Sequence, residues 1–263
     1  MRHGSSAREP AGAARKRAGP PPASSSAGAG ILYLVPTPLG NLEDITLRAL
    51  RVLGSVDWVA AEDTRRTAIL FQAHGLRRPL FAHHAHNEHA VTPSLVRRLR
   101  EGESGALVTD AGTPGIADPG FFLARAAREA GIAVTVLPGP TMVTAALLAS
   151  GFPPQPFVFL GYVPATAGQR RSFFEGIRQE ERTVVAFESP HRLARSLEVL
   201  ADTIPQRRIA VVREFSKLHE EVAVGTAAEL RERFGAKVRG EVTLVFHPLA
   251  RSSRARAGEG EVS

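Results

Sequence analysis

GALVTDAGTPGIADPG, residues 105–120, joins a short apolar strand pattern directly to a loop rich in glycine and proline. In an open parallel sheet, ligands bind beyond the carboxyl ends of the strands, so the residues that follow such a strand are informative. Glycine allows a close backbone approach and positive φ, and proline fixes the shape of a loop. The stretch therefore predicts a parallel α/β sheet whose edge forms a main-chain cradle for a flat or polar cofactor.

Three more predicted strands in the first half of the chain end in loops of the same kind. They are 31–35 before PTPLGN (36–41), 57–61 before EDTR (62–65) and 133–137 before PGPT (138–141). Glycine and proline in a single loop would only mark a turn, but four successive loops on one edge favour a binding site. No G-x-x-x-x-G-K-[ST] occurs and no G-x-G-x-x-G opens the first helix, which disfavours a P-loop NTPase or an ordinary dehydrogenase.

The alternation of strand and helix patterns predicts an α/β fold of two domains with mixed, mostly parallel sheets. The proline-rich segment GFPPQP (151–156) predicts the boundary, with a cofactor-binding domain over 30–152 and a second α/β domain over 156–248. Strands are expected near 157–161, 183–187, 208–213, 220–225 and 241–246. Helices are expected to be capped by Asp44, Thr92 (before Pro93), Thr141 and Ser189 (before Pro190).

The ends of the chain differ from its middle. Residues 1–29 and 251–263 contain few large apolar residues and are expected to be disordered; the leader also fits a transit peptide or a misassigned start codon. These ends account for +5 of the formal charge of +7, so net charge alone argues little for a nucleic-acid partner.

No apolar run is long enough to span a membrane, which predicts a cytoplasmic protein. The lack of cysteine excludes thiolate chemistry.

Seven motifs together resemble the ribosomal RNA small subunit methyltransferase I family, within the tetrapyrrole methylase-like enzymes that use S-adenosylmethionine. They are LYLVPTPLGNLEDIT (32–46), AEDTR (61–65), HAHNEH (84–89), DAGTPGIADPG (110–120), LPGPTMVTAAL (137–147), ESPHR (188–192) and REFSKLHEE (213–221). The resemblance implies 2'-O-methylation of a cytidine in the decoding region of 16S rRNA, within the assembling 30S subunit. It also implies a homodimer whose cofactor lies between the two domains.

The resemblance further implies which residues hold S-adenosylmethionine. In the first domain these are Pro38, Leu39, Gly40, Gly112, Thr113, Pro114, Gly115, Ile116, Ala117 and Thr141; in the second they are Phe187, Glu188, Val242 and Thr243.

A ribose hydroxyl is a poor nucleophile until its proton is removed or polarised, and REFSKLHEE offers a carboxylate and a lysine for this task. We expect Glu214 and Lys217 to act near the acceptor hydroxyl; an ordinary surface salt bridge is an equal alternative. Lysine is rare here, with three among 33 basic residues, which draws attention to Lys217. Arg213, Arg192 and Arg65 are the expected substrate contacts, Arg213 through a phosphate.

Two further groups have open interpretations. Glu62, Asp63 and Arg65 of EDTR form either an internal ion-pair network or a direct substrate contact. The histidines at 83, 84, 86 and 89 are numerous enough for a metal site, but their spacing fits no standard pattern. We therefore expect no metal and favour a loop contacting RNA.

The rival functions are a methyltransferase acting on a tetrapyrrole or a protein, and a non-catalytic rRNA-binding assembly factor.

Overall fold

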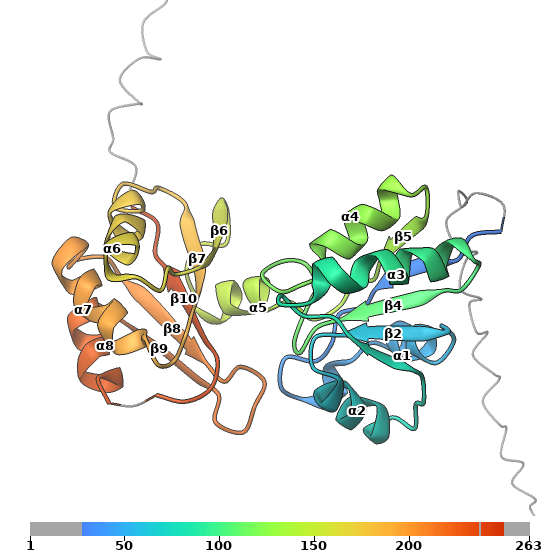
Figure 1. Ribbon diagram of the computed structural model, residues 1–263. Helices are drawn as coiled ribbons and strands as arrows, with labels where there is room; N and C mark the ends of the chain where they lie inside the picture. The colour runs from blue at the N-terminus through green and yellow to red at the C-terminus, as the bar shows by residue number, and fades with distance from the viewer. Residues whose placement is uncertain (1–27, 237, 250–263) are drawn as a thin grey trace, which may run out of the picture.

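The computed structural model describes residues 28–236 and 238–249, which form two lobes, each built on its own sheet (Figure 1). The predicted disordered tail, nearly all of the leader and Lys237 lie outside the described residues. No helix among the described residues is both long and apolar enough to cross a membrane.

The first sheet is wholly parallel, with strand order β3-β2-β4-β1-β5. Its strands are β1 (Ile31–Leu34), β2 (Trp58–Ala61), β3 (Leu80–Ala82), β4 (Gly105–Val108) and β5 (Ala133–Val136), and its helices are α1 (Leu47–Leu53), α2 (Thr64–Ala73), α3 (Glu88–Arg100) and α4 (Phe121–Glu129). Helices α1 and α2 cover one face and α3 and α4 the other. The central strands β2 and β4 are therefore buried throughout, as their continuous apolar sequences require.

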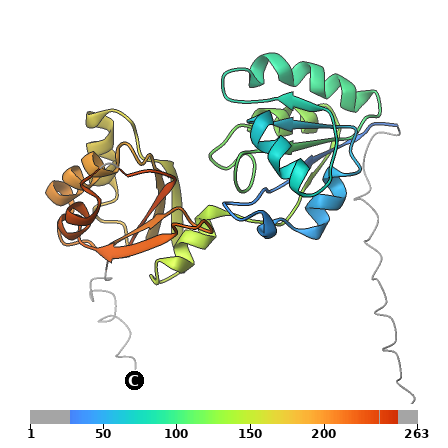
Figure 2. The ribbon, with the colours of Figure 1, turned by 90° about the horizontal axis from the view of Figure 1, so that it is seen from below.

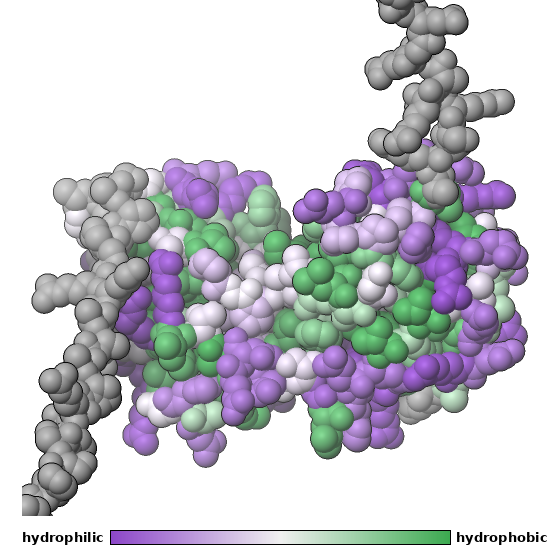
Figure 3. Space-filling model, turned by 180° about the vertical axis from the view of Figure 1, so that it is seen from behind, coloured by the Kyte–Doolittle hydropathy of each residue, from purple (hydrophilic) through white to green (hydrophobic). Residues whose placement is uncertain are grey.

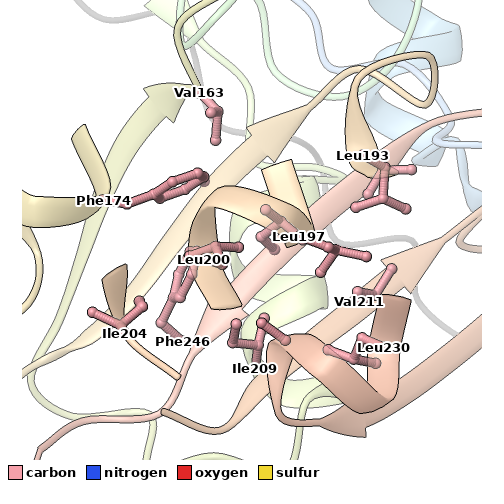
Figure 4. Packing of buried hydrophobic residues seen from close by; sticks show 14 of the residues in the cluster. Val163, Phe174, Leu193, Leu197, Leu200, Ile204, Ile209, Val211, Leu230 and Phe246 are labelled. Atoms are coloured by element: carbon pink, nitrogen blue, oxygen red, sulfur yellow. The ribbon is translucent and has the colours of Figure 1, made fainter. Parts of the chain in front are cut away.

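The second sheet has the order β6-β7-β10-β8-β9, in which only β6 and β7 run parallel. Its strands are β6 (Phe157–Tyr162), β7 (Thr183–Glu188), β8 (Ile209–Arg213), β9 (Glu221–Gly225) and β10 (Val242–Phe246). Helices α6 (Ala167–Gly176), α7 (Leu193–Thr203) and α8 (Ala227–Phe234) cover one face. There Leu197 and Leu200 of α7 pack among Ile209, Leu230 and Phe246 (Figure 4).

Helix α5 (Met142–Ala149) connects the lobes and lies between them in both ribbon views (Figures 1 and 2). The sequence assigned this segment to the first domain, yet its buried Val143, Ala146 and Leu147 pack against the second sheet. The chain thus leaves the first domain at the end of β5. The helix that follows packs against β7, β10 and β8 on the inner face of the second sheet.

The prediction of an α/β fold with mixed, mostly parallel sheets is confirmed, since five of the eight strand pairings between described residues are parallel. All antiparallel pairings belong to the second sheet. Strand β3, with only three residues, was missed.

Three predicted helix starts were wrong. Asp44 ends the short 3-10 helix η1 (Leu42–Asp44), and the Oγ1 of Thr46 caps α1 by accepting from the Ala49 N–H at 3.0 Å. Helix α3 begins five residues before Pro93, because the Asn87 carbonyl accepts from the N–H groups of residues 90 and 91. Helix α7 begins at Leu193 rather than after Ser189.

Candidate functional site

The loops after β1, β4 and β5 meet at the carboxyl edge of the first sheet and are bonded to one another. Thr37 and Gly112 exchange two backbone hydrogen bonds of 3.0 Å, which ties the PTPLGN loop to the DAGTPG loop. The Thr113 hydroxyl donates to the Pro140 carbonyl at 3.1 Å, which adds the PGPT loop. Gly112 has a φ of +76°, a conformation that suits glycine, so this crossing depends on it.

The EDTR loop after β2 joins the same network through carboxylates. The Asp110 N–H donates to a Glu62 carboxylate oxygen at 3.2 Å, and the Asp63 N–H donates to Asp110 at 3.1 Å. Arg66 pairs with Asp110 at 3.3 Å, and Arg65 pairs with Asp63 at 2.8 Å. Of the residues expected to form the EDTR ion-pair network, Asp63 and Arg65 pair with each other, whereas Glu62 is joined to Asp110 through a backbone N–H. All four predicted loops form one connected cradle.

A cavity of about 370 Å³ lies above this cradle and below the second domain. Its first-domain lining is Leu39, Glu62, Arg66, Asp110–Thr113 and Ile116–Asp118, and Thr141–Val143 add the start of α5; its second-domain lining is Tyr162, Phe187–Pro190 and Gly240–Thr243. The second domain contributes Tyr162 at the end of β6, the end of β7 with the residues after it, and the start of β10 with the residues before it. Because β10 is antiparallel to both β7 and β8, its beginning lies at the edge where those two strands end.

Ten of the fourteen residues predicted for the cofactor line this cavity: Leu39, Gly112, Thr113, Ile116, Ala117, Thr141, Phe187, Glu188, Val242 and Thr243. Pro38 and Gly40 line an adjoining cavity of about 190 Å³, which also contains Lys217. Pro114 and Gly115 line neither cavity. They shape the turn that presents the neighbouring residues, with Gly115 at a φ of +80°.

The carboxylate of Glu188 is fully buried and serves the structure of the second domain. It accepts from the Ser189 N–H at 2.7 Å, receives a short hydrogen bond from the Ser196 hydroxyl and pairs with Arg192 at 3.2 Å. These bonds fix the turn before α7, which explains why Ser189 is not the cap. The side chain of Glu188 is therefore engaged away from a ligand.

Glu214 and Lys217 form an ion pair of 2.9 Å at the mouth of the second cavity. Lys217 also pairs with Glu241 at 3.3 Å, and the Glu241 N–H donates to Glu214 at 3.0 Å. Glu214 and Ser216 both have positive φ, at 50° and 60°, which is a strained backbone for residues other than glycine. This loop lies against the first domain, since a Cβ on Gly40 would overlap the side chain of Lys217.

The ion pair fixes the charges of both residues. Burial opposes the charged form of Lys217, but its hydrogen bond with Glu214 and the charge of Glu241 outweigh burial, so its pKa is raised. Burial likewise opposes ionisation of Glu214, but the bonds from Lys217 and from the Glu241 backbone leave its pKa lowered. Lys217 is thus a cation at neutral pH and Glu214 an anion, and neither is poised to exchange a proton there.

The three predicted substrate arginines differ in availability. Arg65 has a side chain that is 89% exposed. Arg213 instead pairs with Glu221 at 2.9 Å, and Arg192 pairs with the buried Glu188. The cavity-lining arginine from the first domain is Arg66, which the sequence analysis did not single out.

The four predicted loop histidines do not converge. His83 is buried with its Nε2 3.4 Å from the Thr92 hydroxyl, His84 and His86 contact each other edge to face, and His89 contacts Phe122. Among the described residues no group of histidine, aspartate and glutamate side chains is arranged to hold a metal ion.

The chain is similar to known proteins over most of its length. The profile of the tetrapyrrole (corrin/porphyrin) methylases matches residues 31–231. A ribosomal RNA small subunit methyltransferase I of Xylella fastidiosa is 44% identical over 88% of this chain and 86% of its own length. One from Escherichia coli O157:H7 is 48% identical over 76% of this chain and 71% of its own. The chain belongs to the ribosomal RNA small subunit methyltransferase I family.

The family's fold is seen in a solved structure. The crystal structure of uroporphyrin-III-C-methyltransferase from Thermus thermophilus aligns with a TM-score of 0.60 and 24% identity, over 83% of this chain and 94% of that one. At this identity the likeness shows the fold alone.

The cofactor of this methyltransferase family is S-adenosylmethionine, and the cavity suits it. That molecule carries a positively charged sulfonium, and the lining includes the carboxylates Glu62, Asp110, Asp118 and Glu241. Glycine-rich backbone supplies hydrogen-bonding groups on one side, while apolar Leu39, Val143 and Phe187 offer surface for a flat ring.

Sequence reasoning missed the polar lining residues Arg66, Asp118, Tyr162 and Glu241. Asp118 lies inside the DAGTPGIADPG motif, which was interpreted through its glycines and prolines rather than its second aspartate. Glu241 precedes its strand, so a rule that inspects only the residues after strands could not find it. Its position follows from the antiparallel direction of β10.

Proposed function

We propose that this chain transfers the methyl group of S-adenosylmethionine to the 2'-hydroxyl of a cytidine in the decoding region of 16S rRNA, in the cytoplasm. The observation that carries the proposal is the juxtaposition of the Glu214–Lys217 loop with the first-domain cradle, which brings an ionised lysine to the cavity that adjoins the cofactor cavity. The cofactor supplies a methyl group already activated by its sulfonium.

The first-domain loops orient the cofactor in this proposal. Bonds between the loops hold Gly112, Thr113 and Pro140 in place before any ligand arrives, so little ordering is left for the binding step. The second domain completes the cavity with Phe187, Val242 and Thr243. Because positioning supplies much of the catalysis of a methyl transfer, a rigid cavity of this kind is what the reaction needs.

Lys217 acts as a fixed cation toward the acceptor nucleotide. Its ammonium is held by Glu214 and Glu241, and 27% of its side chain remains exposed at the cavity mouth. A cation there attracts the phosphate beside the acceptor ribose and polarises the hydroxyl. The exposed Arg65 at the rim adds a second phosphate contact, whereas Arg192 and Arg213 support the site through their glutamate partners.

The choice of rRNA over a tetrapyrrole or a protein rests on the relatives, which are named for rRNA and are 44% and 48% identical to this chain. The cavity itself would serve each of these acceptors. A non-catalytic assembly factor would have no use for a cofactor cradle. Binding of S-adenosylmethionine therefore distinguishes a methyltransferase from an assembly factor.

We also propose that the enzyme is a homodimer that acts on the assembling 30S subunit. Helix α5 covers only the middle of the inner face of the second sheet. The exposed apolar residues left on that side are Leu148, Phe157, Val222 and Val224. Green surface is correspondingly plentiful on the second lobe in Figure 3. Exposed apolar side chains gathered on one side of a domain are typical of an interface between subunits.

The experiment that tests the proposal maps 2'-O-methyl groups on small-subunit rRNA from a strain that lacks the gene. One cytidine of the decoding region should lose its methyl group and regain it when the gene is restored. Restoration with Lys217→Met should fail although the variant binds cofactor, with Lys217→Arg as the matched control for charge. A fully methylated decoding region in the deletion strain would refute the assignment.

A further inference from the structure

One carboxylate of the cofactor cavity is free of protein partners. Asp118 lies on the loop between β4 and α4 and lines the cavity. Within residues 28–236 and 238–249, its side chain takes part in no hydrogen bond and no ion pair. A partly buried aspartate normally has such a partner, so its absence leaves both oxygens for a ligand or a proton.

The other acidic side chains of the cavity are occupied. Glu62 accepts from the Asp110 backbone at 3.2 Å, and Asp110 accepts from the Asp63 backbone and pairs with Arg66. Glu241 pairs with Lys217 at 3.3 Å. Burial raises the pKa of Glu62 and of Asp110, but each of these carboxylates is bonded to a protein donor, which leaves it less free to approach a ligand.

Lys217, Glu214 and Tyr162 are unsuited to remove a proton. Lys217 keeps its proton because its pKa is raised, and Glu214 is held ionised by that lysine. Burial, together with the charges of Asp118, Glu241 and Glu62, raises the pKa of Tyr162, so its phenol stays neutral. Tyr162 faces Asp118 across the cavity from the second domain and can donate a hydrogen bond but not accept the reaction's proton.

We propose that Asp118 is the general base of the methyl transfer, an inference that rests on the proposed function. The acceptor hydroxyl attacks the methyl carbon of the cofactor, forming the oxygen–carbon bond while the carbon–sulfur bond breaks. The sulfur keeps the electron pair of that bond and becomes a neutral thioether. The hydroxyl proton passes to a carboxylate oxygen of Asp118, which later releases it to water.

The surroundings of Asp118 suit this task. Burial raises its pKa to about 6, and the charges of Glu62, Asp110 and Glu241 act in the same direction. Arg66, the arginine in the cavity lining, is paired with Asp110. A base whose pKa lies near the working pH is largely ionised yet still accepts a proton readily, which is the condition for efficient general base catalysis.

The test compares the wild-type enzyme with Asp118→Asn, using 30S subunits from the deletion strain as the acceptor. Asparagine keeps the size of the side chain but cannot take a proton, so we expect the single-turnover rate of methyl transfer to fall by about 10²–10⁴-fold. Affinity for S-adenosylhomocysteine, measured by calorimetry, should stay within about threefold. The wild-type rate should decline below a pH of about 6, and the residual rate of the variant should lack that limb.

Two further variants complete the design. Asp118→Glu should retain part of the wild-type rate, because it keeps a carboxylate at this position on a side chain that is one methylene longer. Asp202→Asn removes an exposed carboxylate that pairs with Arg171 on the second domain and should change neither rate nor affinity.

The proposal is overturned if Asp118→Asn methylates at more than one tenth of the wild-type rate. It is also overturned if its affinity for S-adenosylhomocysteine falls as far as its rate, since Asp118 would then be a cofactor ligand. If Asp118→Asn does not fold, which would be seen as a missing unfolding transition, the pH profile of Asp118→Glu provides the test instead. If wild-type enzyme does not modify the subunits at all, it is the proposed function that fails.

Discussion

The hydroxyl of Ser216 donates a hydrogen bond to the carboxylate of Asp44 at 2.5 Å and joins two residues that are 172 positions apart in the chain. Ser216 belongs to the strained loop that carries Lys217, and Asp44 ends the short helix after the PTPLGN loop. The bond therefore links the acceptor side of the site to the cofactor cradle. We infer that it holds the second domain closed over the first.

Ser216→Ala should weaken cofactor binding while leaving each domain folded. Removing one hydrogen bond of this kind costs about 0.5–1.5 kcal/mol, which corresponds to about 2–10-fold in affinity. Calorimetry with S-adenosylhomocysteine measures the change. Ser94→Ala is the matched control, because that hydroxyl bonds the Val91 carbonyl within α3, and it should leave affinity unchanged. Equal affinities for the two variants would show that the bond does not govern closure.

Gly40→Ala should disable the site more severely. A methyl group at this position would overlap the Cγ of Lys217 and approach the Phe215 carbonyl to 3.0 Å, so the Lys217 loop must move outward. A displacement of about 1 Å in a positioning element lowers a rate by about 10²-fold. Gly168→Ala meets no atom within 4 Å on α6 and is the control. Methyl transfer by Gly40→Ala at the control's rate would contradict the close packing of the two loops.

Asp118→Asn should make the protein more stable at neutral pH. The pKa of Asp118 lies at about 6 in the folded chain against an ordinary value of 3.8, so the folded state binds the proton more tightly. Stability conferred by the protonated acid is present below about pH 4 and is lost as the pH rises to about 6. Asparagine does not ionise and so avoids this loss of folding stability. After allowance for solvent screening, the loss is on the order of 1 kcal/mol.

Thermal unfolding at several pH values measures this effect. Above pH 7 the Tm of the variant should exceed that of the wild type by about 2–4 °C. The difference should vanish near pH 4, where the wild-type aspartate is protonated. A constant difference at every pH would mean that titration of Asp118 is not its source.

Gly105→Ala should destabilise the first domain, because the added methyl group would overlap the ring of Trp58 on the neighbouring strand β2. Both residues are buried in the middle of the sheet, where the ring has no room to retreat. Overpacking of this kind costs about 1–3 kcal/mol. Urea unfolding gives the value, with Gly176→Ala on α6, which has open space, as the comparison. An unchanged midpoint would show that the ring can shift.

The local sequence determined nine of the ten described strands, the two-domain α/β class and the four loops that follow strands in the first domain, because short-range periodicity and turn chemistry are properties of neighbouring residues. The motifs also led to the family. Only the tertiary structure decided the direction of β10, which brings Glu241 to the edge where Glu188 and Arg213 end their strands. A strand's pattern of side chains does not specify which way its partner runs.

The roles of individual polar residues were likewise decided by long-range contacts. Glu188 was expected to contact the cofactor, yet its carboxylate accepts hydrogen bonds from the turn before α7 and from α7 itself. Asp118 sits in a predicted cofactor loop and has no side-chain partner among the described residues, because Arg66 pairs with Asp110 instead. Lys217 could have been a surface salt bridge by its sequence alone. Its contact with the Gly40 loop makes it part of the site, since only folding brings the two segments together.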